Sequence, residues 1–164
     1  MNVRPLDPAD LAAVAQVHAD CFTRQRESLA WVTSTSNAYP RFRYFVAESD
    51  GSIVGYIVWG EKSGFRDEFV LELEQLAVQS AFRSRGIGRA LIRVSLLDVQ
   101  MSLQQRASRV KAVLATTRAD NDAQRLYKEV LGAEVQATIE DLYSANEVIM
   151  VAQNPAGKVI VAAP

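Results

Sequence analysis

The chain has 164 residues, of which 49% are hydrophobic and 23% charged, and its formal net charge is -1 at pH 7. This length suits one domain with a substantial core, and the balanced charge argues against a dedicated nucleic-acid binder. No apolar run reaches the roughly 18 residues that cross a bilayer, and the first ten residues lack the apolar stretch of a secretory signal. Cys21 is the single cysteine, which excludes an internal disulfide and suits a reducing compartment. We therefore expect a cytoplasmic globular protein with no membrane and no nucleic-acid partner.

The first half of the chain predicts alternating strands and helices. Residues 2–6 form a short strand, and a helix then begins with Asp7 as its N-cap and Pro8 at the first helical position. The pattern between residues 23 and 43 is poor, and one short helix is expected around residues 29–33. Strands at 44–48 and 53–59 flank Asp50-Gly51, a pair that is typical of a hairpin turn.

The second half shows clearer periodicity. A strand over 69–78 precedes a helix from 86 to about 106 with one buried stripe, a strand over 110–116, and a helix over 120–131 that Asp120 caps and Gly132 ends. Strands at 133–138 and 147–152 complete a single α/β (α+β) domain over residues 1–153, a mixed sheet of about six to seven strands with about four helices. For the tail, residues 154–164, disorder, an added strand and contact with a second subunit in a homodimer all stay open.

The segment between the 69–78 strand and the next helix is the most informative. Gly86 and Gly88 stand where the helix begins, and Arg83, Arg85 and Arg89 lie within seven residues. Unbonded N–H groups and the helix dipole favour an anion at such a helix start, and glycine lets a phosphate approach closely. The segment predicts a pyrophosphate cradle, the alternative being a glycine-containing helix start with solvated arginines. Neither P-loop nor Rossmann spacing fits.

This segment resembles a known signature. Arg83-x-x-Gly86-x-Gly88, preceded by Leu76-Ala77-Val78, resembles the signature of the GNAT acyltransferases, and the resemblance extends over most of the chain. It implies the GNAT fold, binding of acetyl-CoA with CoA as product, and acetyl transfer to a primary amine. It also implies that the turn holds the CoA pyrophosphate and that the strand end pairs with the pantetheine arm and helps to hold the thioester carbonyl. The implied cofactor-binding residues are Leu76, Ala77, Val78, Arg83, Ser84, Arg85, Gly86, Ile87, Gly88 and Arg89.

Two carboxylates on the 69–78 strand are candidate bases. Glu72 and Glu74 are two residues apart, so the period of a strand places both on one face. Amine acetylation needs a base, because an alkylamine with a pKa of about 10.4 is protonated at neutral pH. Glu74 is slightly favoured because it lies nearer the thioester end, and a sheet face that is open to water is the alternative.

A tyrosine on the 120–131 helix is the candidate acid. GNAT proteins carry a tyrosine there that protonates the departing thiolate, and Tyr127 matches it; ordinary packing on the buried face of the helix is the alternative. The family also places an asparagine seven residues before this tyrosine. That position is Asp120 here, with Asn121 next to it, so the resemblance leaves open which of the two contacts CoA.

Other residues are given structural roles. His18 is expected to be a hydrogen-bonded core or rim histidine and Cys21 a buried small side chain. With one histidine and one cysteine, no metal site is expected. Four aromatic residues are expected either to line the acceptor pocket or to pack in the core: Trp31, Tyr39, Phe42 and Tyr44.

Three functions stay open. The first is an N-acetyltransferase for a small-molecule amine or amino-acid derivative, and the second is a peptide or protein N-terminal acetyltransferase with an open groove. The third is a CoA-binding regulatory module without turnover. Glu72, Glu74 and Tyr127 argue against the third, because a binding module needs neither a base nor an acid.

Overall fold

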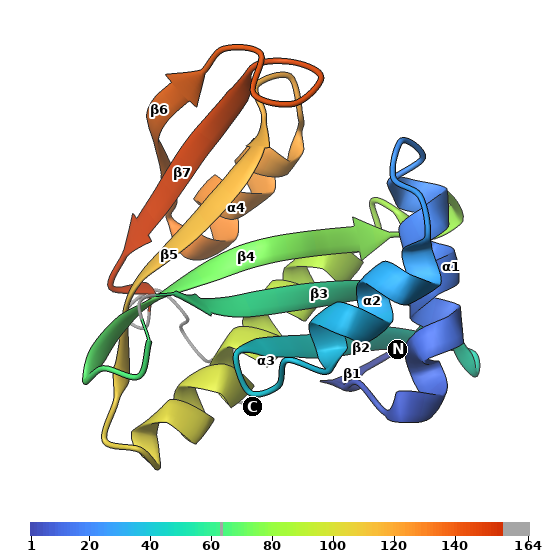
Figure 1. Cartoon of the computed structure of the whole chain (residues 1–164), viewed down its shortest axis with the longest axis horizontal. Helices are drawn as coiled ribbons and strands as arrows, with labels where there is room; N and C mark the ends of the chain where they lie inside the picture. The colour runs from blue at the N-terminus through green and yellow to red at the C-terminus, as the bar shows by residue number, and fades with distance from the viewer. Residues whose placement is uncertain (63, 156–164) are drawn as a thin grey trace. The chain divides into compact units, whose positions relative to one another are not determined.

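A computed structural model describes residues 1–62 and 64–155, in which seven strands form one mixed sheet in the order β1-β2-β3-β4-β5-β7-β6 (Figure 1). The strands are β1 Asn2–Pro5, β2 Phe42–Ser49, β3 Ser52–Lys62, β4 Glu68–Val78, β5 Arg109–Arg118, β6 Glu134–Ile139 and β7 Glu147–Gln153. The α-helices of these residues are α1 Leu11–Cys21, α2 Ser28–Ser36, α3 Ile87–Gln104 and α4 Ala123–Leu131. The predicted α/β fold is confirmed. Of the predicted tail, residues 154–164, only the first two are among the described residues, and residues 156–164 lie outside them.

These residues divide into two compact units. The first unit contains Met1–Gly60 and Gln75–Ser95, and the second contains Glu61–Glu74 and the chain from Leu96 onward. Strand β4 and helix α3 therefore each contribute residues to both units. Neither unit has a described helix that is long and apolar enough to span a membrane.

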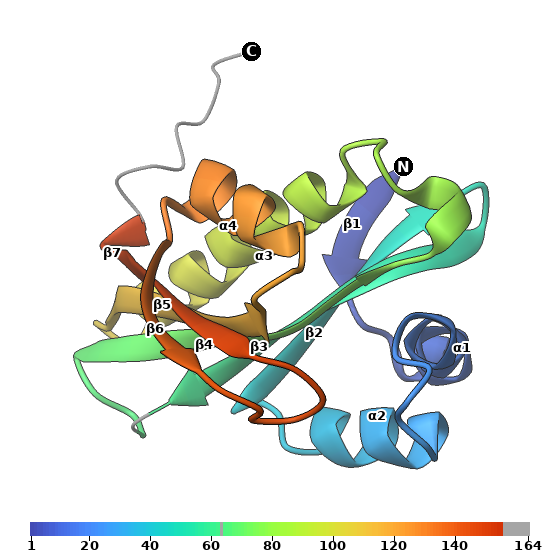
Figure 2. The same ribbon diagram turned by 90° about the horizontal axis from the view of Figure 1, so that it is seen from above.

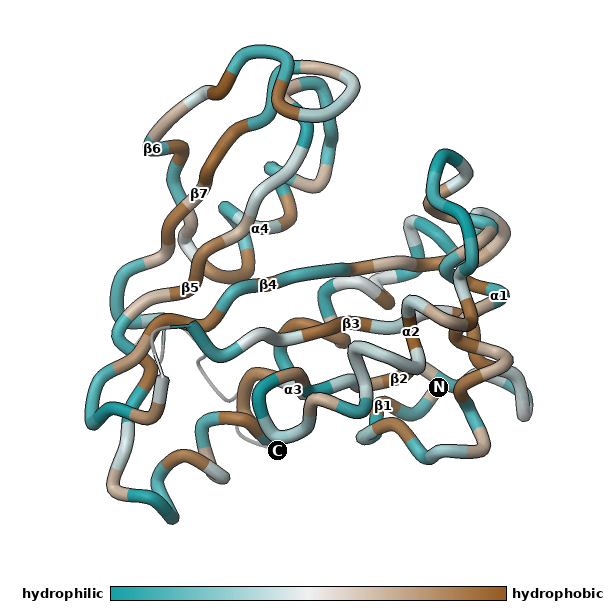
Figure 3. Tube along the Cα trace, viewed as in Figure 1, coloured by the Kyte–Doolittle hydropathy of each residue, from teal (hydrophilic) through white to brown (hydrophobic). Residues whose placement is uncertain are grey.

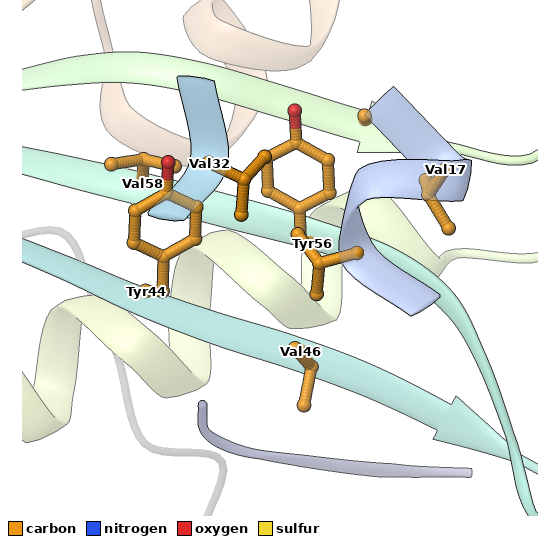
Figure 4. Packing of buried hydrophobic residues seen from close by; sticks show 8 residues of the cluster. Val17, Val32, Tyr44, Val46, Tyr56 and Val58 are labelled. Carbon is orange, nitrogen blue, oxygen red and sulfur yellow. The ribbon is translucent and has the colours of Figure 1, made fainter. Parts of the chain in front are cut away.

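In the first unit, α1 and α2 cover one side of β2 and β3 (Figure 2). The antiparallel register places Tyr44 opposite Val58 and Val46 opposite Tyr56. Figure 4 shows the two tyrosine rings side by side. Their planes are stacked, and their centroids are 6.0 Å apart. Burial of this apolar cluster stabilises the unit by removing its surface from water. The cluster consists of Val14, Val17, Val32, Tyr44, Val46, Tyr56, Val58 and Ala77.

The opposite side of β3 packs against the first half of α3. Trp59 donates its indole N–H to Ser95 Oγ at 2.7 Å, and both side chains are buried. Gly55 is required at this contact, because a Cβ there would lie 2.8 Å from the carbonyl oxygen of Ala77 and 3.4 Å from Leu91 Cδ1. Side-chain bulk at position 55 would therefore push β3 away from both β4 and α3.

Two local predictions for the first unit are confirmed: the Asp7 cap and the hairpin turn at Asp50-Gly51. Asp7 accepts a hydrogen bond from Ala9 N at 2.9 Å and forms a capping box with Asp10, although the first turn is a 3-10 helix and α1 begins at Leu11. Asp50 and Gly51 have φ values of 52° and 76°, as the two-residue turn between β2 and β3 requires.

In the second unit, the first part of β4 runs parallel to β5, with Leu71 opposite Val113. Strand β7 lies antiparallel between β5 and β6. The hydrophobic residues of β5 and β7 contrast with the hydrophilic stretch in the middle of β4 (Figure 3). Helix α4 buries Tyr127, Val130 and Leu131, and Gly132 ends it at φ 70°, as predicted.

Two further helices, α2 and α4, begin elsewhere than the sequence predicts. Helix α2 is longer than the expected 29–33 segment and starts at Ser28. Helix α4 starts at Ala123, because Asn121 Oδ1 rather than Asp120 accepts the Ala123 N–H, at 2.9 Å. Asp120 pairs instead with Arg118 at 2.7 Å, so the prediction that Asp120 caps this helix is wrong.

Candidate active site

The turn between β4 and α3 has the features of an anion site. Ser84 and Gly86 have φ values of 60° and 79°, and the first α3 hydrogen bond runs from Ala90 N to Gly86 O at 3.0 Å. Within the described residues, no backbone acceptor meets the N–H groups of Gly86, Ile87 and Gly88. A Cβ built on Gly86 would meet no atom within 4 Å. This open space beside unbonded N–H groups fits a phosphate at the helix start.

The arginines of this turn differ in their contacts. Arg83 donates from Nε to the Val78 carbonyl oxygen at 3.0 Å, so this side chain fastens the turn to the end of β4. Arg85 is exposed and stacks over the ring of Phe82, with 5.1 Å between its guanidinium carbon and the ring centroid. Arg89 is half-buried. The exposed guanidinium of Arg85 is therefore best placed to meet an anion from solvent.

The strand end that precedes the turn is held from two directions. Cys21 Sγ lies 3.5 Å from the same Val78 carbonyl oxygen, and Gln79 N donates to Val54 O at 2.9 Å. Ala77 is buried, whereas Leu76 and Val78 are half-buried. Cys21 packs against the core cluster but is only half-buried, so it is less buried than expected. These contacts fix the β4 backbone where the resemblance implies that it pairs with the pantetheine arm.

A chain of buried polar side chains lies beside this strand. Tyr56 OH donates to Gln75 Oε1 at 3.0 Å, and Gln75 Nε2 lies 3.5 Å from His18 Nε2. His18 Nδ1 lies 2.9 Å from Ser28 Oγ, the first residue of α2. Since the Gln75 amide nitrogen can only donate, His18 Nε2 accepts and its proton is on Nδ1. His18 is fully buried, so its predicted role as a hydrogen-bonded core residue is confirmed.

The two candidate bases have different surroundings in the second unit. Glu72 has a side chain that is 15% exposed, and its carboxylate lies 2.5 Å from Lys62 Nζ. Glu74 is exposed. Glu72 would give up its ion pair with Lys62 if it took a proton, and solvent reaches the exposed side chain of Glu74.

Tyr127 is 6% exposed on the buried face of α4. Burial raises the pKa of its phenol to about 12. The side chain therefore keeps its proton throughout the physiological range, which is the form that a proton donor needs. In the same unit, Asn121 Oδ1 accepts the Ala123 N–H at the start of α4 and Asp120 binds Arg118, so both side chains have an intramolecular role.

The four aromatic residues expected in the acceptor pocket or the core differ in their exposure. Trp31 and Tyr39 are 48% and 70% exposed, whereas Tyr44 is buried in the core and Phe42 is half-buried. The exposed rings of Trp31 in α2 and Tyr39 just after it are thus available to another molecule, and Arg43 lies over the Tyr39 ring.

Sequence reasoning missed two polar residues near these groups. Gln75 interrupts the apolar side of β4, and Glu147 begins the buried strand β7 while being only 6% exposed. The signal that could have found them is a polar residue at a position where the strand pattern predicts burial.

Comparison with known proteins identifies the family. The chain matches the model of the Acetyltransferase (GNAT) family over residues 11–133. It is 31% identical over 134 residues to the N-alpha-acetyltransferase RimI of Mycobacterium tuberculosis (strain ATCC 25618 / H37Rv), which covers 79% of this chain and 77% of the relative.

Solved structures are similar to this chain in fold. Ard1 from Thermoplasma volcanium is similar with a TM-score of 0.72 and 27% identity, over 92% of this chain and 95% of that one. Arabidopsis thaliana NAA60 in complex with acetyl-CoA shares the fold with a TM-score of 0.74 at 20% identity, over 93% and 98%. The chain belongs to the GNAT acetyltransferase family. It is an acyl-CoA-dependent N-acetyltransferase.

Proposed function

We propose that this enzyme transfers the acetyl group of acetyl-CoA to the α-amino group of a peptide or protein. The carrying observation is the match to an N-alpha-acetyltransferase across most of both chains. The exposed Trp31 and Tyr39 support an acceptor larger than a small amine, because such rings offer contact area to a chain. The acceptor in this proposal is therefore the peptide alternative of the sequence analysis rather than the small molecule.

The first unit supplies the binding groups for the cosubstrate. The N–H groups of Gly86, Ile87 and Gly88 face the open space at the start of α3, where a pyrophosphate would gain hydrogen bonds and the helix dipole. Arg85 adds positive charge there. The bound thioester supplies an activated acetyl group, and the β4 backbone from Leu76 to Val78 orients it.

The second unit supplies the proton transfers. Glu74 accepts a proton from the acceptor's ammonium, directly or through water, so that a neutral nitrogen attacks the thioester carbonyl. As the carbon–sulfur bond breaks, Tyr127 donates its phenolic proton to the leaving thiolate. Glu72 is the less suitable base because Lys62 holds its carboxylate.

An acceptor panel tests this function. Purified enzyme and acetyl-CoA are incubated with short peptides that have a free N-terminus, the same peptides with a blocked N-terminus and a lysine side chain, amino acids, polyamines and aminoglycosides. Thiol release and product mass are measured. Turnover only with free N-termini is the expected result. Turnover only with small amines would contradict the peptide assignment and restore the small-molecule acceptor.

A further inference from the structure

A buried carboxylate in the second unit has no role in the function proposed so far. Glu147 is the first residue of β7 and is 6% exposed. Within the part of the chain that the structure describes, its carboxylate makes no hydrogen bond and no ion pair. Its oxygens are not among the fully buried side-chain atoms that lack a partner, so they still reach the surface. Partial burial nevertheless makes the charged form costly unless a donor or cation meets it.

The natural partner of this carboxylate is engaged elsewhere. Arg118 stands directly opposite Glu147 in the β5–β7 ladder. Its guanidinium is used by Asp120, with Nε to Oδ1 at 2.9 Å and Nη2 to Oδ2 at 2.7 Å. Burial therefore raises the pKa of Glu147, and the attraction of Arg118 offsets this only in part. The carboxylate is therefore available to a cation that reaches it from solvent.

The strand register shows which surface Glu147 belongs to. Glu72 of β4 is opposite Leu114 of β5, and directly opposite residues share a face. Along β5, Leu114 and Arg118 lie on that same face because strand side chains alternate. Glu147 is opposite Arg118, so it shares the sheet face of Glu72. The face thus carries a carboxylate at each end of this row.

We propose that Glu147 binds a second positively charged group of the acceptor, distinct from the amine that is acetylated. This inference rests on the proposed function, and it narrows the acceptor to peptides with a lysine or arginine side chain near the N-terminus. An ammonium or guanidinium supplies the charge-assisted hydrogen bonds that the Glu147 carboxylate lacks. The exposed Asp120–Arg118 pair stays in place, with the Arg118 guanidinium bound to Asp120.

The test compares peptides that differ only in one charge. Wild-type enzyme is assayed with Ala-Xaa-Gly-Gly, Ala-Gly-Xaa-Gly and Ala-Gly-Gly-Xaa, where Xaa is lysine or glutamine. At one of the three positions lysine is expected to raise kcat/KM by about tenfold, the effect of a hydrogen bond to a charged group. Glu147→Gln, which keeps the side-chain volume, is expected to remove this preference while glutamine peptides react as before.

A matched control separates the site from the general field of the protein. Glu140→Gln removes the same charge from an exposed residue that follows β6, and it is expected to keep the lysine preference because exposed charges are screened. The inference is wrong if wild type shows no preference at any position, if Glu147→Gln retains it, or if Glu140→Gln loses as much. The absence of any preference in the wild type overturns the inference even where a variant folds poorly. If no peptide is acetylated at all, the proposed function itself fails.

Discussion

The two carboxylates of β4 differ in burial, and this difference favours Glu74 as the base. Lys62 holds Glu72 at 2.5 Å, whereas Glu74 is exposed. Burial raises the pKa of Tyr127 to about 12, so its hydroxyl does not titrate near neutrality. Any rise of kcat between pH 6 and 9 then belongs to the base or to the acceptor amine.

We predict that Glu74→Gln lowers kcat by about 100-fold and weakens its rise with pH. Raising the pH should partly rescue this variant, because more of the amine then arrives neutral. Glu72→Gln should mainly raise the KM of the acceptor. Steady-state kinetics from pH 6 to 9.5 measure both effects. Wild-type turnover and pH dependence in both variants would mean that neither carboxylate is the base.

At the scale of elements, the start of α3 can be tested with a matched pair of glycines. Gly86 and Gly51 have φ values of 79° and 76°, and a Cβ on either would meet no atom within 4 Å. Alanine at each position should therefore cost about 1 kcal/mol of unfolding free energy through backbone strain alone. Only Gly86→Ala should also lose CoA binding, because its Cβ enters the space proposed for the pyrophosphate.

The measurement is the melting temperature with and without CoA. At a hundred times the Kd, CoA should stabilise wild type and Gly51→Ala by about 2.7 kcal/mol, and should do much less for Gly86→Ala. An equal CoA response in the two variants would remove the pyrophosphate site from this turn. No response in the wild type at millimolar CoA would remove it as well.

The order of elements could be predicted from periodicity and turn residues alone. The stripe of Ile92, Leu96, Val99 and Leu103 on α3 is fully buried, as its helical spacing predicts. The start of α4 could not be predicted, since three adjacent residues, 120 to 122, are all good caps. Arg118 forms an ion pair with Asp120, so this residue does not cap the helix. Such an ion pair depends on three-dimensional contacts and cannot be read from the sequence.

In the candidate site, too, local features could be predicted from the sequence and long-range contacts could not. The glycine–arginine turn is local in sequence, so its spacing predicted the unbonded N–H groups at α3. Glu147 and Gln75 matter because of residues that are distant along the chain: Arg118 across the β5–β7 ladder, and Tyr56 and His18 across the first unit. No pattern within a single strand reveals such partners, since register and tertiary packing create them.

At the scale of the whole molecule, one histidine controls how the free energy of unfolding changes with pH just below neutrality. His18 is the single histidine of the chain. Burial lowers its pKa below the usual 6.5, although an interaction with the Gln25 side chain, as acceptor for protonated His18, acts in the other direction. A proton on Nε2 would also face the donor of Gln75 and break the chain that runs from Tyr56 to Ser28. The folded protein therefore favours neutral His18.

We predict that the free energy of unfolding is constant above about pH 7 and falls as the pH drops below about 6.5, by up to about 1.4 kcal/mol per pH unit. The unfolded chain takes up the proton first, so the loss continues until the pH reaches the lowered pKa of the folded state. His18→Gln should be less stable at pH 8, yet lose nothing between pH 7 and 5.5. Its stability should even rise slightly, because the raised pKa of Glu147 favours folding as the pH falls. Urea unfolding at half-unit pH intervals measures both curves, and parallel curves for the two proteins would show that His18 does not set the acid response.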